Sequence, residues 1–435
     1  MNNKAKTNAK SRSNATDGCI ISAGEIFADG AMLELIAGSS VLNKPDVLLW
    51  NGRKATVGAR VEHGGCSYEA PKLDPILWRA MRLPAGCHDY GSARALFDGI
   101  RNLFQRHLGL PESESGLVAS FAISTWLADR LPSAPGLTIS GPDEELGIDV
   151  LLLLSCVCRH PFLLAALTPA TFRSLPMELG LTLLLVQQDL KANMQILLRS
   201  SRYHGLHFAG KRGSVVDRYG AIAIFCGNEA AVNHLGGGAI HVSLPASQSQ
   251  SCALDEYALN EIANRFQSRL LTYRLKTSGK VRESQVDVSE LTFATSRLAR
   301  TLAACFPEDS ELANDTVRLL GPQDEDARLQ RANSIECAIV EVLLGFIHEQ
   351  ELTEMKVGDL TDLANGLLRS RGEMLAYGAE EVGWKLKGLN LVRHRTSSGS
   401  QIQFDRQTSQ QVHRRARAYG LGSLRVETCS ECAVV

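Results

Sequence analysis

The chain has 435 residues, 44% of them hydrophobic and 21% charged, which is typical of a folded protein with two or three domains. The formal net charge of −1 excludes a global electrostatic attraction to nucleic acid or membranes, so such binding would need a local patch. The longest apolar run, residues 150–158, is far shorter than a transmembrane helix requires, so we expect no membrane partner.

The N-terminal part of the chain reads as a tail followed by a small domain. Residues 1–17 have almost no large apolar side chain, which predicts a disordered basic tail. Residues 18–84 contain short β-like runs separated by glycines, which predict a small β-rich unit. The apolar stretch near the N-terminus is interrupted by Glu25 and Asp29, which argues against a secretion signal.

Residues 85–254 alternate between helical and strand-like patterns. Apolar residues recur at helical spacing over 92–108 and 117–131, and a third helix extends to about residue 158. Five strand-like runs follow one another at 136–139, 162–166, 181–186, 221–226 and 239–243. This alternation predicts an α/β core with a mostly parallel sheet.

The C-terminal half is predicted to be mainly helical. Residues 255–330 read as a helical lid that ends in an acidic linker at 321–326. Three short helices and a β-ribbon then make residues 331–420 similar to a winged helix-turn-helix domain, and 421–435 read as a flexible tail. The predicted helices are 336–348, 357–368 and 379–389, and the ribbon strands are 391–395 and 401–404.

The stretch after the first core strand has the layout of a phosphate-binding loop without its chemistry. A working loop reads G-x-x-x-x-G-K-[ST], because its glycines, lysine and hydroxyl hold the phosphates and a magnesium ion. Here the frame that starts at Gly141 and Pro142 has Leu146 in place of the second glycine, Gly147 in place of the lysine and Ile148 in place of the hydroxyl residue. An ordinary strand-to-helix turn is the alternative interpretation.

The strand at 181–186 lacks the acidic pair that would hold magnesium. Val186 and Gln187 stand at the expected positions, and the nearest carboxylate, Asp189, comes three residues beyond the expected metal position. We therefore expect no cofactor and no magnesium, while weak ATP binding stays open.

In motif order, residues 85–420 resemble bacterial P-loop ATPases of the helicase and replication-initiator type found in phages and plasmids. The resemblance implies a P-loop NTPase-like fold and assigns Asn228 the place of the polar residue that senses the γ-phosphate. It also implies that a hairpin over 205–217 projects into a central channel, with Lys211 and Arg212 at its tip on the nucleic-acid backbone. The alternative for this hairpin is an ordinary solvated turn.

Positive charge is concentrated near the C-terminus. Residues 381–420 contain eight basic residues and two acidic ones, a local charge of +6. The candidate DNA contacts on the third helix, the ribbon and beyond are Lys385, Lys387, Arg393, Arg395, Arg414 and Arg415. Few side chains suited to reading bases lie on the third helix, so low sequence specificity is expected; a protein-binding winged helix is the alternative.

Cysteine usage indicates a reducing compartment. Four of the eleven cysteines lie in apolar runs and read as buried free thiols: Cys156, Cys158, Cys226 and Cys337. We therefore expect a cytoplasmic protein. The pair Cys429 and Cys432 is half a zinc motif with no second pair nearby in the sequence, so no metal site is expected.

Together these features predict a catalytically inactive P-loop-like protein that binds DNA in a mobile-element or replication process. Two alternatives remain. One is an active DNA-dependent ATPase in which Asp149 or Asp189 supplies the metal carboxylate. The other is a non-enzymatic scaffold, and homo-oligomers stay open in each case.

Overall fold

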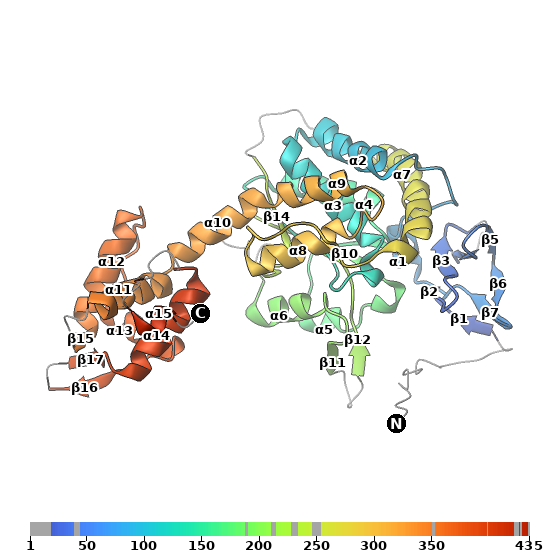
Figure 1. Ribbon diagram of the computed structural model, residues 1–435. Helices are drawn as coiled ribbons and strands as arrows, with labels where there is room; N and C mark the ends of the chain where they lie inside the picture. Colours follow the sequence, from blue (N-terminus) through green and yellow to red (C-terminus); the bar gives the residue numbers. More distant parts are fainter. Residues whose placement is uncertain are drawn as a thin grey trace, which may run out of the picture. The chain divides into compact units, whose positions relative to one another are not determined.

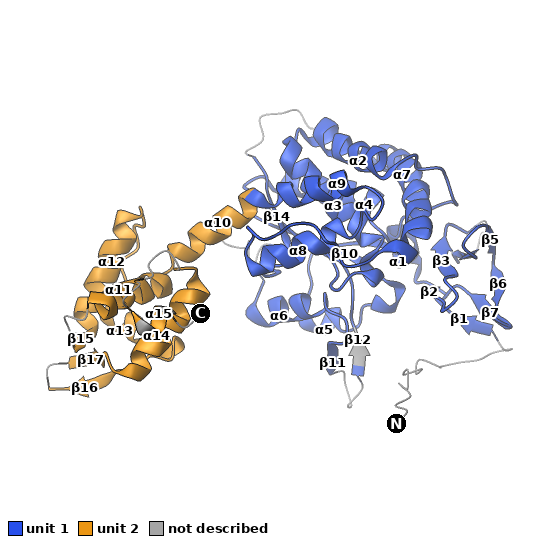
Figure 2. Cartoon of the chain, in the orientation of Figure 1, with its two compact units in different colours: residues 1–321 blue, residues 322–435 orange. Residues whose placement is uncertain are grey.

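The structure is a computed structural model that divides into two compact units, residues 1–321 and 322–435 (Figure 2). It describes residues 19–38, 44–187, 190–209, 215–227, 234–245, 254–349, 353–397, 399–421, 426 and 429–433. The expected basic tail lies outside these residues. Within them, no helix combines the length and the apolar composition that crossing a membrane requires.

The first unit begins with the predicted β-rich part, which forms two small sheets (Figure 1). The three-stranded sheet has the order β1 (Cys19–Ile21), β7 (Cys66–Glu69), β6 (Arg60–His63). The antiparallel four-stranded sheet consists of β2 (Gly24–Ile26), β3 (Met32–Ile36), β4 (Asp46–Trp50) and β5 (Ala55–Gly58). Strand β3 is buried along its whole length, so this sheet packs closely against the rest of the unit.

A five-stranded, all-parallel sheet forms the centre of the first unit, and it fits a P-loop-like core. The strand order is β14 (Ile240–Ser243), β8 (Gly136–Ser140), β13 (Ile222–Cys226), β10 (Thr182–Val186), β9 (Pro161–Leu164). All four neighbouring pairs run parallel. The predicted mixed α/β class and the five predicted strands are thus confirmed.

The two faces of this sheet belong to two different apolar clusters. Leu184 and Phe225 pack with the larger helices, whereas Leu183, Leu185 and Ile224 pack on the other face. Successive side chains of a strand point to opposite faces, so sheet strands buried on both sides read as continuous apolar runs. This is why the strands were recognisable in the sequence.

Helices cover both faces (Figure 1). The larger cluster includes residues of α2 (Ala93–Leu108), α3 (Glu112–Thr125), α4 (Glu144–Val157), α7 (Glu256–Thr277), α8 (Phe293–Ala303) and α9 (Ser310–Leu319). The other cluster includes α1 (Pro75–Ala80), α5 (Pro169–Phe172), α6 (Ala192–Ser200) and the N-terminal strands. The β-rich part therefore shares a core with the parallel sheet.

The second unit contains helices and a three-stranded antiparallel sheet around one apolar core. Its elements are α11 (Ile335–Glu349), β15 (Glu354–Lys356), α12 (Val357–Ser370), α13 (Ala379–Gly388), β16 (His394–Thr396), β17 (Gly399–Gln403), α14 (Arg406–Tyr419) and α15 (Ser430–Ala433). The three predicted helices and the ribbon are present. Strand β15, which pairs with β17, was not predicted.

The expected linker at 321–326 is the start of a helix, α10 (Gly321–Ala332). Proline is tolerated in the first turn of a helix because its missing N–H would have no partner there. Gly321 and Pro322 thus begin a helix instead of interrupting one, so the segment expected to be a linker is helical. The boundary between the two units falls at the same place.

Candidate functional site

The loop that joins β8 to α4 is short, and one of its side chains caps the N-terminus of α4. Strand β8 ends at Ser140 and α4 begins at Glu144, so only three residues connect them. The Asp143 carboxylate accepts a hydrogen bond from the Leu146 N–H at 3.0 Å and caps the helix. Glu144 and Glu145 follow in the first turn.

Phosphate groups bind helix N-termini through free backbone N–H groups and the positive end of the helix dipole. In α4 one of these N–H groups is satisfied by Asp143, and the two glutamates add negative charge at the same end. Carboxylates stabilise a helix N-terminus and repel a phosphate there. This end of α4 is therefore built to be stable without an anion.

Packing around Gly141 in the loop and Gly147 in α4 leaves no room for side chains. A Cβ atom on Gly141 would lie 2.8 Å from the Cβ of Leu244, and one on Gly147 would lie 2.3 Å from the Phe225 ring. Gly147, which stands at the lysine position of the sequence frame, therefore faces the core from within α4. A side chain at this position would start against the Phe225 ring.

The residue that follows β10, where the sequence frame places the acidic pair, is the amide Gln187. The side-chain oxygen of Gln187 accepts a hydrogen bond from the Leu167 N–H at 3.1 Å, and the Gln187 N–H donates to the Phe225 carbonyl at 3.2 Å. Gln187 thus links the segment after β9 to β10. Asp189 and Asn228 lie outside the described residues.

The predicted hairpin between β10 and β13 is present at its base. Strands β11 (His207–Ala209) and β12 (Val215–Asp217) pair antiparallel, with Phe208 opposite Val216. Lys211 and Arg212, the expected contacts at the tip, lie outside the described residues.

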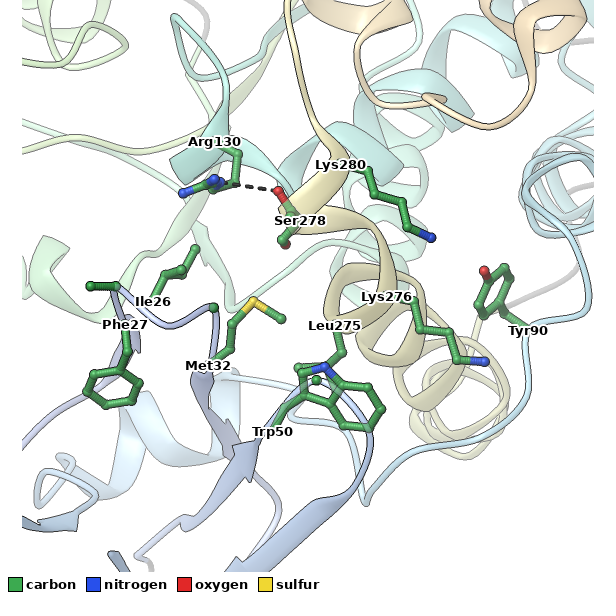
Figure 3. A pocket seen from close by; sticks show the side chains of 14 residues that line it. Ile26, Phe27, Met32, Trp50, Tyr90, Arg130, Leu275, Lys276, Ser278 and Lys280 are labelled. Atoms are coloured by element: carbon green, nitrogen blue, oxygen red, sulfur yellow. Dashed lines mark hydrogen bonds between the residues drawn. The ribbon is translucent and has the colours of Figure 1, made fainter. Parts of the chain in front are cut away.

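Two cavities of the first unit lie away from the β8–α4 loop. One, of about 760 Å³, is lined by Met32, Trp50, Tyr90, Arg130, Lys276 and Lys280, among others (Figure 3). In it the Lys276 ammonium lies 5.4 Å from the centre of the Tyr90 ring, and Arg130 donates to the Ser278 carbonyl at 3.3 Å. The second, of about 530 Å³, is rich in arginine: Arg130, Arg282, Arg297 and Arg300.

Neither cavity is lined by any of residues 141–147. Arg130 precedes β8, so both cavities adjoin the segment that leads into the amino end of that strand, whereas ligands of open α/β sheets bind beyond the carboxyl ends. No sequence pattern indicates these cavities, because their linings come from distant segments. Their positions do not fit an ATP site of the P-loop kind.

The six candidate DNA contacts of the second unit fall into two groups. Lys385 forms an ion pair with Glu336 at 2.7 Å, and Arg415 donates to the Leu389 carbonyl at 3.1 Å. These two contacts hold α13 against α11 and α14. The other four candidates, Lys387, Arg393, Arg395 and Arg414, are exposed.

Helix α13 and the segment between it and β16 are in close contact on one exposed surface. The Lys387 ammonium lies 5.7 Å from the centre of the Trp384 ring, and Trp384 is 59% exposed. A Cβ atom on Gly383 would lie 2.2 Å from a guanidinium nitrogen of Arg393, so Arg393 lies directly over the α13 backbone. Cations and an aromatic ring are thus presented together.

No family model matches the chain, and no curated protein matches it. Among solved structures, the chain is similar to the apo A form of the NrS-1 C-terminal region, with 12% identity and a TM-score of 0.34, over 85% of this chain and 96% of that one. A second apo A-form structure of that region gives 10% identity and a TM-score of 0.33 over the same shares. Drosophila ORC bound to DNA gives 11% identity and a TM-score of 0.16, over 76% of this chain and 93% of that one. With similarity this low, function has to be inferred from the chain's own residues.

Proposed function

We propose that this protein binds duplex DNA with low sequence specificity through its second unit and does not hydrolyse ATP in its P-loop-like core. The exposed cations Lys387, Arg393, Arg395 and Arg414 are the observation that carries the proposal. The resemblance in motif order to phage and plasmid ATPases makes replication or a mobile element the expected setting.

The order of elements in the second unit supports a winged helix-turn-helix domain. Helices α11, α12 and α13 are followed by the β16–β17 hairpin, which would be the wing. In the helix-turn-helix motif the recognition helix enters the major groove, and neighbouring elements contact the backbone. Here α13 would be the recognition helix, and Arg393 and Arg395 would contact phosphates.

Charge decides which part of α13 would meet DNA. Its first turn carries Glu380 and Glu381, whereas Lys387 lies in its last turn. Phosphates would be repelled by the first turn and attracted by the last. The contact therefore involves Trp384, Lys387 and the hairpin, a surface with more positive charge than base-reading groups, which favours low specificity.

The arrangement at α4 supports the absence of ATP hydrolysis. Removing one preorganised contact to a transition state typically costs about 10²–10³ in rate. At this site the phosphate-binding lysine is replaced by the buried Gly147, and the capping carboxylate of Asp143 occupies a helix N–H. These losses together would leave no useful turnover.

DNA binding is tested by fluorescence anisotropy of the full chain on duplexes of unrelated sequence. The logarithm of the association constant should fall linearly with the logarithm of salt concentration. Replacing Lys387, Arg393, Arg395 and Arg414 by alanine should make that slope shallower by up to about 0.9 for each phosphate that is no longer neutralised. The matched control replaces Arg53, Lys54, Lys72 and Arg79, four exposed cations of the first unit. Equal effects of both quartets, or binding insensitive to salt, would refute the proposal.

Steady-state ATP hydrolysis, measured with and without DNA, tests the second part of the proposal, that the P-loop-like core does not hydrolyse ATP. We expect no activity above background. Activity that is lost when Asp149 or Asp189 is changed to asparagine would instead establish the active ATPase with an atypical site.

A further inference from the structure

Four side chains in the second unit bring two imidazole nitrogens and two sulfurs together. They are His348 on α11, His413 on α14, and Cys429 and Cys432 beside and within α15. Their ligand atoms all lie within 4.8 Å of one another. The two histidines precede Cys432 by 84 and 19 positions, so only the fold brings the set together.

The short distances in this cluster are close to those around a tetrahedral zinc ion. The two Nε2 atoms are 3.2 Å apart, Cys429 Sγ is 3.2 Å from His413 Nε2, and Cys432 Sγ is 3.2 Å from His348 Nε2. Zinc bond lengths with tetrahedral angles place two nitrogens about 3.3 Å apart and a nitrogen and a sulfur about 3.5 Å apart. The side chains are therefore preorganised around one central point.

The orientation of His413 also suits a metal ligand. Its Nδ1–H donates to the Ser409 carbonyl at 2.8 Å, which leaves the lone pair on Nε2, the atom that faces the cluster. Histidines that bind metals commonly make such a hydrogen bond through their other nitrogen, because it fixes the tautomer and the ring orientation. His413 is 4% exposed, so its ring is held in place by packing as well.

Hydrogen bonds alone satisfy this cluster poorly. Nε2 of His413 has a single lone pair, yet both His348 and Cys429 approach it at 3.2 Å. One divalent ion at the centre would satisfy all four ligand atoms at once. Two sulfur and two nitrogen ligands in a tetrahedral arrangement suit Zn²⁺ better than magnesium or calcium, which prefer oxygen.

We propose that His348, His413, Cys429 and Cys432 form a structural zinc site that fastens the C-terminal end of the chain to α11 and α14. Binding converts both thiols to thiolates, releases their two protons to solvent and forms two Zn–S and two Zn–N bonds. Four protein ligands leave no open position, so the site is structural and not catalytic.

The surroundings explain what such a site contributes. Helix α15 has four residues, and α14 donates two side-chain hydrogen bonds to its Glu431: Arg417 to the carbonyl at 3.0 Å and Gln410 to the carboxylate at 3.3 Å. Hydrogen bonds of this kind each contribute only about 1 kcal/mol. Metal ligation would supply further stabilisation and would fix α14, which also carries Arg414 and Arg415. The inference stands independently of DNA binding.

Metal content is the first test. The untagged full chain, purified from zinc-supplemented cells, should contain one zinc ion per chain by mass spectrometry of the metal. Cobalt in its place should give the strong visible bands of a tetrahedral site and a thiolate-to-cobalt band in the near ultraviolet. Cys429→Ser with Cys432→Ser, or His413→Ala, should lose the metal. The control pair Cys66→Ser with Cys87→Ser, exposed cysteines of the first unit, should keep it.

A second measurement uses the unaltered chain, so it does not depend on whether the variants fold. Alkylation mapped by peptide mass spectrometry should be slow at Cys429 and Cys432 until a strong chelator is added, while the rates at Cys66 and Cys87 should not change. Two results would overturn the proposal in favour of a hydrogen-bonded thiol–imidazole cluster. One is that the zinc-free chain does not bind one zinc ion per chain on titration. The other is that the chelator does not change the alkylation rates of Cys429 and Cys432.

Discussion

Glu34 is an acidic residue in the middle of the apolar strand β3, and it is 1% exposed. Its carboxylate bonds Arg274 Nε at 2.6 Å and Arg159 Nη2 at 2.9 Å, and Arg274 also pairs with Asp129 at 2.7 Å. Desolvation alone would raise the pKa of Glu34, but the two arginines outweigh it and hold that pKa below its usual value. The network joins the N-terminal sheet to α7.

Glu34→Gln should therefore be strongly destabilising, because it leaves two buried guanidinium groups without their full countercharge. We expect the free energy of unfolding to fall by about 3–5 kcal/mol, measured by urea denaturation. Glu25→Gln, an exposed residue on the neighbouring strand β2, should change it by less than about 0.5 kcal/mol. Similar losses in both variants would rule out a special role for the network.

His160 should make stability depend on pH. Burial, followed by the adjacent Arg159, lowers its pKa to about 3, and its Nδ1–H donates to the Leu179 carbonyl at 2.6 Å. In the unfolded chain His160 takes up a proton near pH 6.5, whereas in the folded chain it does not. The stability that His160 contributes is thus complete above about pH 6.5 and is lost as pH falls towards 3.

Within that pH window the free energy of unfolding should fall by about 1.4 kcal/mol per pH unit because of His160. Asparagine tolerates the positive φ of 43° found at this position. His160→Asn should therefore flatten the dependence between about pH 6 and 4.5, measured by urea denaturation at each pH. The same change at the exposed His394 should leave the slope as it was; a slope retained in His160→Asn would refute the assignment.

At the scale of elements, the sequence was most informative where burial is continuous. The five strands of the parallel sheet and most helices lie at the predicted residues, because their apolar patterns reflect packing on one or both faces. The capping of α4 by Asp143 was not recognised, because a frame of spaced glycines says nothing about where the helix begins.

The proposed zinc ligands illustrate the opposite limit. Cys429 and Cys432 appeared as an isolated pair, and no local spacing connects them with His348 or His413 on two separate helices. Only the packing of α14 against α11 and α15 brings them together, and such long-range contacts leave no periodic signal. Strand β15 was missed for a similar reason, since three residues paired with a distant strand are too short for a pattern.

Replacing glycine by alanine should have opposite effects on stability at two helical positions, Gly366 in α12 and Gly147 in α4. Alanine normally stabilises a helix relative to glycine by about 1 kcal/mol. Gly366→Ala in α12, where a Cβ atom meets nothing within 4 Å, should show this gain. Gly147→Ala should instead destabilise the chain by about 1–3 kcal/mol, because its Cβ would lie 2.3 Å from the Phe225 ring.

Thermal denaturation of the two variants measures both effects. Gly147→Lys should be no more stable than Gly147→Ala and should gain no ATP binding by calorimetric titration, because the side chain would start inside the core. A stabilised Gly147→Ala variant would show that the packing against Phe225 is looser than this distance implies.

At the scale of the whole molecule, the chain has separate cores in its two units. The second unit encloses its own apolar cluster, which includes Leu343, Leu360 and Leu386, and the clusters of the first unit contain none of these residues. Domains with independent cores can unfold as separate cooperative steps, and a two-state description then fails. Differential scanning calorimetry should accordingly resolve two transitions.

Variants and a chelator together assign these transitions. Leu386→Ala should lower one of them and Leu184→Ala the other, because each leaves a cavity in one core at a cost of about 2–5 kcal/mol. A metal bound only by the folded state stabilises that state by mass action. Removing zinc should therefore lower only the transition that Leu386→Ala lowers. If the chelator moves neither transition, the two cores still unfold separately but the site at α15 holds no stabilising metal. If it moves the transition assigned to Leu184, the metal lies in the first unit instead.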